Sequence, residues 1–285
     1  LVHVTSRQGS IVLPVQRGED LAAGQAFIAM HWGPEYLGGA GSTGAPLAGV
    51  NALTTPAFCP VSKQPELKHT AVKVLKAELP WSLLAMAWLP ETEVLATREA
   101  LRALMPGFAY AACVPFGRER SGVLLRAAAY EAPPEGLLAH IETLLGLSGS
   151  DVLRYADRRR GQHRAMRLTR TGSESRLEAF VLAGDTRAEA WIRTLLQDER
   201  PAQAYGRLLL APGARAPVAV APRSRQVCTC FNVGEDAIRR TLDGCAGSEE
   251  QRLGALQGAL QCGTHCGSCI PELRRLVRTT APATA

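Results

Sequence analysis

The chain opens with short stretches in which apolar and polar residues alternate. Val2 and Val4 stand between polar neighbours, "SRQG" follows as a turn, and "SIVLPV" returns as a second apolar stretch. "GQAFIAMHW" and "TAVKVL" are similar, whereas the residues from Gly33 to Gly49 form a long glycine-rich stretch. Such patterns are typical of half-buried strands. Residues 1–78 are therefore predicted to form a β domain with one long loop, of the kind that is usually functional or mobile.

Helical and strand patterns alternate over residues 79–212. Thr97 is predicted to cap a helix that carries Leu101, and "PPEGLLAHIETLLGL" places its leucines on one helical face. Three short strands are predicted at "VLRYAD", "RAMRLTR" and "RLEAFVLA". Thr186 and Glu189 then have the spacing of a capping box that opens a last amphipathic helix. This part is predicted to be a small α+β domain.

A proline-rich stretch, residues 213–225, reads as a linker, and residues 226–279 follow as a small helical unit. Its helices are predicted at "GEDAIRRTL", after the capping pair Ser248 and Gln251, and at "IPELRRLV", where Pro271 stands in the first turn. A unit this small usually needs a metal or disulfides to fold.

Length and composition are those of an ordinary globular chain. The 285 residues allow two or three domains of about 100–150 residues each, and 46% apolar with 20% charged residues excludes wholesale disorder. No apolar run approaches the roughly 20 residues of a membrane span, and no export signal is visible. We therefore expect a cytoplasmic protein without a membrane partner. Because Leu1 lies inside a β pattern, we also expect a piece of a longer protein.

The net charge of +6 comes mostly from arginine. Nucleic-acid binding would require that charge to cluster on one face among aromatic residues, which make up only 5% of the chain. The one tight run, Arg158 to Arg160, precedes Gly161 and reads as a turn. No nucleic-acid partner is predicted, and the surplus of arginine could equally serve docking to an acidic electron carrier.

Four of the eight cysteines form two close pairs in the small helical unit, Cys228-x-Cys230 and Cys266-x-x-Cys269, and a fifth, Cys262, stands just ahead of the second pair. Thiols in a cytosolic protein more often bind metal or do redox chemistry than form disulfides. A zinc site most often uses two C-x-x-C pairs, whereas a [2Fe–2S] cluster needs four thiolates, two for each iron. The two close pairs favour the cluster and leave zinc as the alternative.

The flanks of these cysteines resemble a known family. The pattern C-x-C-F-x-V followed by C-G-x-x-C-G-S-C-x-P-E-L, over residues 226–278, looks like the bacterioferritin-associated-ferredoxin type of [2Fe–2S] domain, which also occurs in nitrite and nitrate reductases. The resemblance implies that Cys228, Cys230, Cys266 and Cys269 hold the cluster and that Cys262 is a neighbour.

A second resemblance covers residues 1–76. "TSRQGSIVLPV", "GQAFIAMHW", "NALT" and "CPVSKQPELKHTAVKV" look like the C-terminal molybdopterin-dinucleotide-binding domain of the nitrate reductase and formate dehydrogenase superfamily, a six-stranded double-psi β-barrel. Because the opening part of that domain is not matched, the resemblance implies a partial barrel. "YADRRRGQHRAMRL", "RLEAFVLAG" and the Cys-rich tail together look like the C-terminal half of an assimilatory nitrate reductase catalytic subunit.

Three site residues follow from this second resemblance. It implies that Asn51 and Lys68 contact a guanine-dinucleotide cofactor, and that His31 lies near the substrate funnel. From the residues alone, Asn51 could be a turn residue, Lys68 a solvated lysine and His31 a hydrogen-bonded core histidine. One departure is Cys59, which stands where the family usually has an Asp that bonds the backbone of a turn.

The resemblance implies a function for the complete enzyme. It would reduce nitrate to nitrite at a molybdenum-bis(molybdopterin guanine dinucleotide) cofactor, with a [4Fe–4S] cluster in the part that precedes this sequence. Electrons would come from a flavoprotein reductase subunit, a ferredoxin or a flavodoxin. No catalytic residue is expected in this fragment. The alternative is a non-enzymatic [2Fe–2S] module for redox sensing or iron handling on an unrelated carrier.

Overall fold

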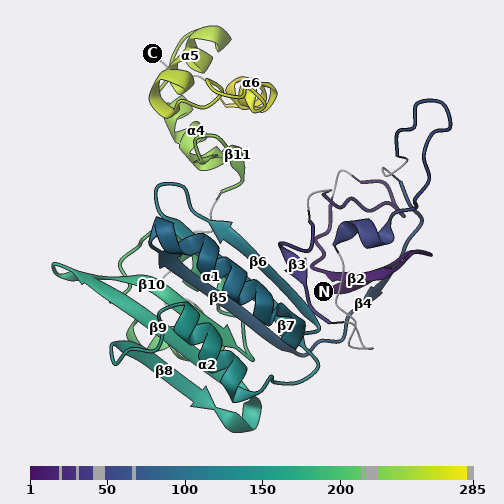
Figure 1. The fold of residues 1–285 in the computed structure, drawn as a ribbon. Helices are drawn as coiled ribbons and strands as arrows, with labels where there is room; N and C mark the ends of the chain where they lie inside the picture. The colour runs from purple at the N-terminus through teal and green to yellow at the C-terminus, as the bar shows by residue number, and fades with distance from the viewer. Residues whose placement is uncertain are drawn as a thin grey trace. The chain divides into compact units, whose positions relative to one another are not determined.

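The computed structural model describes residues 1–18, 21–29, 32–40, 49–65, 69–213, 215 and 224–280 (Figure 1). The chain divides into two compact units, residues 1–220 and 221–285. Helices and antiparallel sheets make up the first unit, and the second is mainly helical, so the predicted mixed α+β architecture is confirmed. None of the described helices combines the length and apolar character that a membrane crossing requires.

The first unit is built on a seven-stranded sheet with the order β3-β6-β7-β5-β10-β9-β8. All of its neighbouring strands are antiparallel. Its strands are β3 (Leu37–Gly38), β5 (Trp81–Leu89), β6 (Tyr110–Phe116), β7 (Ser121–Ala129), β8 (Val152–Asp157), β9 (Gln162–Thr171) and β10 (Glu174–Ala183).

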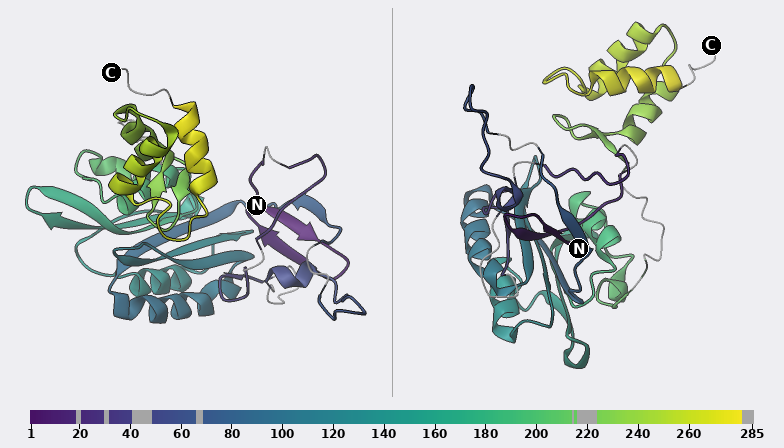
Figure 2. Two further views of the ribbon diagram at one scale, coloured as in Figure 1. Left: turned by 90° about the horizontal axis from the view of Figure 1, so that it is seen from above. Right: turned by 90° about the vertical axis from the view of Figure 1, so that its right-hand side faces the viewer.

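Helices cover both faces of this sheet. α1 (Glu91–Leu104) and α2 (Glu135–Leu144) lie across one face, whereas α3 (Glu189–Gln197) packs on the other (Figures 1 and 2). Short 3-10 turns, η2 (Met105–Gly107), η3 (Arg158–Arg160) and η4 (Gly206–Leu209), connect the elements. The two faces have separate apolar cores, because successive side chains of a strand point to opposite sides.

The central strand β5 shows why part of this sheet was missed in the sequence. Leu83 and Ala85 point to the core beneath α1 and α2, while Leu84 and Met86 point to the core beneath α3. Both faces are buried, so the strand is a continuous apolar run without alternation. The three strands around "VLRYAD", "RAMRLTR" and "RLEAFVLA" are present, but β5, β6 and β7 carried no clear signal.

Two predicted helix starts are wrong. α1 begins at Glu91 rather than at Thr97, which lies inside the helix. The capping box at Thr186 is absent, because α3 begins at Glu189. The Thr186 hydroxyl instead lies 3.1 Å from that of Ser82, and Glu189 pairs with Arg126 on the sheet. Contacts with the sheet thus replace the predicted capping hydrogen bonds of Thr186 and Glu189.

The first residues form a smaller sheet with the order β2-β1-β4, made of β1 (Val2–Thr5), β2 (Ser10–Leu13) and β4 (Lys73–Lys76). η1 (Val50–Leu53) packs on it through Leu53. β3 pairs with β6, so this part is joined directly to the large sheet. The strand predicted at "GQAFIAMHW" is not formed by residues 24–29, and the described residues make three strands here rather than a closed barrel.

The second unit has three helices around one core, α4 (Glu235–Asp243), α5 (Glu249–Leu260) and α6 (Ile270–Thr279), and a small ribbon of β11 (Gln226–Cys228) and β12 (Val233–Gly234). Ile238, Leu256 and Leu273 are fully buried between the helices. The capping box of Ser248 and Gln251 is present. Arg252, only 5% exposed, donates hydrogen bonds to the carbonyls of Val277 and Thr280 at the end of α6.

Candidate metal centre

Two short loops carry the four predicted cysteine ligands. Cys228 ends β11 and Cys230 follows in the turn before α4, while Cys266 and Cys269 lie in the loop between α5 and α6. Gly263 and Gly267 adopt φ angles of +84° and +72° in the second loop, a conformation that favours glycine. The helices thus hold two compact turns, and each turn presents two thiols.

The thiols of the two loops approach each other. The sulfur atoms of Cys230 and Cys266 are 3.2 Å apart, and Cys228 lies beside Cys269, where it affects the pKa of that thiol. Cys228 and Cys269 are buried, Cys230 is half-buried and Cys266 is exposed. The structure therefore brings the four predicted ligands together as two neighbouring pairs, each with one thiol from either loop. Which two thiols share an iron stays a prediction.

The thiols of Cys266 and Cys269 differ in pKa because their surroundings differ. A hydrogen bond with the Ser268 hydroxyl, 3.1 Å from the sulfur of Cys266, is the main cause that lowers the pKa of this exposed thiol to about 7. Burial is the main cause that raises the pKa of Cys269 to about 11. Metals bind the thiolate, so the lowered pKa of Cys266 favours metal binding and the raised pKa of Cys269 opposes it.

Four thiols are the donor set that a two-iron centre needs. Across the described residues, no three His, Cys, Asp or Glu side chains converge as a single ion would require. The four thiols instead form two pairs of neighbours, which suits a cluster that takes two thiolates at each iron. The donor set thus fits a [2Fe–2S] cluster.

Cys262, which we predict to be a neighbour and not a ligand, lies in the core of the second unit. Its side chain is fully buried, and burial raises the pKa of its thiol. Its sulfur contacts the carbonyl of Leu256, 3.8 Å away in α5. This thiol therefore packs in the helical core behind the ligand loops.

Of the three predicted pterin residues, Asn51 alone lies in the described part of the chain. Asn51 lies in η1 with an exposed side chain, and its backbone carbonyl accepts a hydrogen bond from the Thr54 hydroxyl. His31 and Lys68 lie outside the described residues. The turn at Cys59 forms without the family's Asp, because the cysteine sulfur accepts the backbone N–H of Ser62 at 3.5 Å. Sulfur thus replaces the expected carboxylate.

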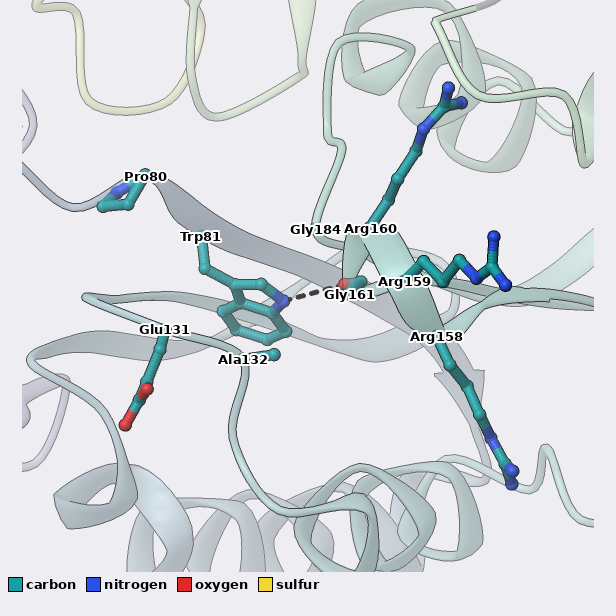
Figure 3. A pocket seen from close by; sticks show the side chains of 9 residues that line it. All are labelled: Pro80, Trp81, Glu131, Ala132, Arg158, Arg159, Arg160, Gly161 and Gly184. Carbon is teal, nitrogen blue, oxygen red and sulfur yellow. Dashed lines mark hydrogen bonds between the residues drawn. The ribbon is translucent and has the colours of Figure 1, made fainter.

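A shallow pocket of about 380 Å³ lies beside Trp81 and the turn η3. Asp157 caps the turn by accepting the backbone N–H groups of Arg159 and Arg160, and the Trp81 indole donates to the carbonyl of Gly161. The three arginine side chains run outward in different directions (Figure 3), so they do not converge on one ligand. The run is a turn, as predicted.

Comparison with known proteins identifies the two ends of the chain. Residues 1–71 match the family described as "Molydopterin dinucleotide binding domain", and residues 226–279 match the "BFD-like [2Fe-2S] binding domain". No solved structure matches the chain.

The whole chain aligns with a larger protein. A nitrate reductase of Klebsiella oxytoca is 29% identical over 288 residues, which cover 97% of this chain and 28% of that protein. A nitrate reductase of Synechocystis sp. is 43% identical over 69 residues, or 24% of this chain and 8% of that protein. The chain is therefore homologous to nitrate reductases over nearly its whole length, and it spans less than a third of the Klebsiella relative.

Proposed function

We propose that this chain is the C-terminal part of a molybdenum-dependent assimilatory nitrate reductase, and that its second unit is the electron-entry domain. The observation that carries the proposal is the four-thiol site formed by Cys228, Cys230, Cys266 and Cys269. It lies in a chain that aligns along 97% of its length with a nitrate reductase. Iron held by these thiolates would accept electrons one at a time from a flavoprotein reductase subunit, a ferredoxin or a flavodoxin.

The first residues would contribute to the site of a molybdopterin guanine dinucleotide cofactor. The family match over residues 1–71 supports this, as does an unusual apolar surface. Nine of the twelve large apolar side chains that are exposed in the described residues lie between Val15 and Leu75. Val74 and Leu75 on β4 are about half exposed. Further parts of the enzyme would cover these side chains and complete a double-psi barrel.

Asn51, Lys68 and His31 are the residues that we assign to this cofactor site. The exposed amide of Asn51 can both donate to and accept from a pterin or guanine edge. Lys68 would meet the pyrophosphate as a point charge, and His31 would lie toward the substrate. Molybdenum in that cofactor would supply the chemistry for the two-electron reduction of nitrate to nitrite. A [4Fe–4S] cluster elsewhere in the enzyme would link it to the entry domain.

The parts of the chain have separate tasks in this proposal. Residues 1–78 bind the cofactor, residues 79–212 form an α+β domain, residues 213–225 are a tether, and residues 226–279 receive electrons. All eight cysteines are free thiols in the structure. Such thiols fit the reducing cytoplasm, where we place the enzyme.

The test is deletion of residues 224–285 from the full-length enzyme. We expect the truncated enzyme to lose nitrate reduction with its natural protein donor but to keep it with reduced methyl viologen, a small donor that can reach the molybdenum side directly. Equal loss with both donors would refute the entry role. The alternative, a non-enzymatic module, would be favoured if the full-length protein contained iron but no molybdenum.

A further inference from the structure

Two polar side chains contact the sulfurs in the more exposed half of the four-thiol site. The Ser268 hydroxyl oxygen lies 3.1 Å from the sulfur of Cys266. The ring nitrogen Nδ1 of His265 lies 3.6 Å from the sulfur of Cys230. Each of these two sulfurs therefore has a polar side chain at hydrogen-bonding distance.

The two contacts are held in different ways. Ser268 follows Cys266 by two residues in the turn before α6, and Gly267 between them has a φ angle of +72°. The geometry of one short turn thus sets the distance between the hydroxyl and the sulfur. The contact of His265 joins the two ligand loops across 35 residues and is longer. Ser268 is therefore expected to have the larger effect on its sulfur.

The other half of the site has an apolar environment. Cys228 and Cys269 are only 1% and 6% exposed, and they lie in the core of the second unit with Leu273. The site thus has an inner side in the apolar core and an outer side with hydrogen-bonding neighbours. The outer side, at the exposed Cys266, is the one that an electron donor can approach.

Metal binding would fix the direction of the two hydrogen bonds. A free thiol can donate or accept, so in the metal-free chain either Cys266 or Ser268 could be the donor. A sulfur that binds a metal has lost its proton and can only accept. The Ser268 hydroxyl and the Nδ1–H tautomer of His265 are then the donors.

We propose that Ser268 and His265 donate hydrogen bonds to the ligand sulfurs of Cys266 and Cys230 and thereby raise the reduction potential of the entry cluster. This inference rests on the proposed function of residues 226–279 as a [2Fe–2S] electron-entry domain. One electron from the donor converts one ferric iron to ferrous iron, and both side chains keep their protons. The ligand sulfurs carry more negative charge after reduction, so donated hydrogen bonds stabilise the reduced state more than the oxidised state.

The experiment is a redox titration of the purified 285-residue chain with mediators, followed by the EPR signal of the reduced cluster. It is done at about pH 8, where an ordinary imidazole is neutral. We expect Ser268→Ala to lower the equilibrium constant for one-electron reduction at least about tenfold, which lowers the potential by about 59 mV. His265→Leu should lower this constant about threefold, because its contact is longer. A Ser268→Ala constant within about twofold of wild type would overturn the proposal.

Two control variants separate the hydrogen bond from the structure of the loop. Ser268→Thr keeps the hydroxyl, so its equilibrium constant should stay within about twofold of wild type. Thr264→Val removes a hydroxyl from the same loop that donates to the carbonyl of Gln261 at 2.7 Å and not to a sulfur. Its constant should also stay within about twofold of wild type. An equal fall in Thr264→Val and Ser268→Ala would overturn the proposal, because the loop and not the donor would then set the potential.

Resonance Raman spectra test the hydrogen bonds in the wild-type chain itself. Exchange into D2O should shift the iron–cysteine stretching bands, and the shift should be smaller in Ser268→Ala. Wild-type bands that do not shift would overturn the proposal. Failure of the proposed function gives a different result, because a wild-type chain without a [2Fe–2S] spectrum would overturn both proposals. A normal wild-type cluster with an unchanged potential in Ser268→Ala would overturn this one alone.

Discussion

Arg252 is the residue whose loss should most weaken the hold of the second unit on its cluster. Its guanidinium is buried and donates to the carbonyls of Val277 and Thr280, at 2.9 and 3.0 Å, where α6 ends. The backbone carbonyls at a helix end have no partner within the helix, so a side chain must satisfy them. In an Arg252→Met variant these carbonyls would remain buried without that donor.

The magnitude follows from the two contacts. Each buried carbonyl without a partner costs about 1–3 kcal/mol, and methionine recovers part of this through packing, so we expect a loss of about 2–4 kcal/mol. A folded unit of this size has only about 3–8 kcal/mol of stability in total. If the cluster escapes through opening of the unit, its rate of loss rises tenfold for each 1.4 kcal/mol or so, which gives at least about thirtyfold here.

The assay separates the two units of the chain. All four tryptophans, Trp32, Trp81, Trp88 and Trp191, lie in residues 1–220, whereas visible cluster absorption reports only on residues 221–285. With an iron chelator in excess, Arg252→Met should bleach at least about thirtyfold faster than wild type, with unchanged tryptophan fluorescence. The matched control is Arg274→Met on the exposed side of α6. Bleaching of the two variants within about threefold of each other would refute the reasoning.

Four further outcomes are expected. Cys262→Ser should keep the visible spectrum and the reduced-state EPR signal, whereas Cys230→Ser or Cys266→Ser should lose both; the reverse pattern would exchange ligand and bystander. Asn51→Ala and Lys68→Ala should lower the molybdenum content of the full-length enzyme without unfolding it, and unchanged metal analysis would count against a cofactor site there. Gly184→Ala should destabilise the first unit by about 2 kcal/mol or more, because Gly184 has a φ of +77° and a Cβ there would lie 2.3 Å from the carbonyl oxygen of Gly161. A urea titration followed by tryptophan fluorescence measures this loss, and the cluster spectrum should not change. Hydrogen bonds from Arg275 and, to a smaller extent, Arg225 lower the pKa of Glu272 from 4.5 to about 2. The ionised carboxylate should therefore stabilise the metal-free second unit fully above about pH 4.5, and this stabilisation should be lost as the pH falls toward about 2. If the calorimetric difference in stability between wild type and Glu272→Gln stayed constant over this pH range, the ion pair would be contradicted.

The second unit was largely predictable because its signals are local. The capping pair of Ser248 and Gln251, Pro271 in the first turn of α6 and the spacing of the cysteines each act within a few residues. These features fixed the helices and the ligand loops. The sequence did not show the pairing of Cys230 with Cys266, because the folded helices bring that contact together across 36 residues.

The first unit was less predictable because distant partners decide its structure. β5 is buried on both faces, so its sequence shows no alternation of apolar and polar residues. The Thr186 hydroxyl contacts that of Ser82, 104 residues away, and does not cap the following helix.

The most direct measurement is a count of iron and acid-labile sulfide in the purified chain, followed by EPR after one-electron reduction. The account predicts two irons and two sulfides for each chain, a signal from one unpaired spin, and loss of both in Cys230→Ser. A chain that holds a single zinc ion, or that binds iron without sulfide, would contradict it.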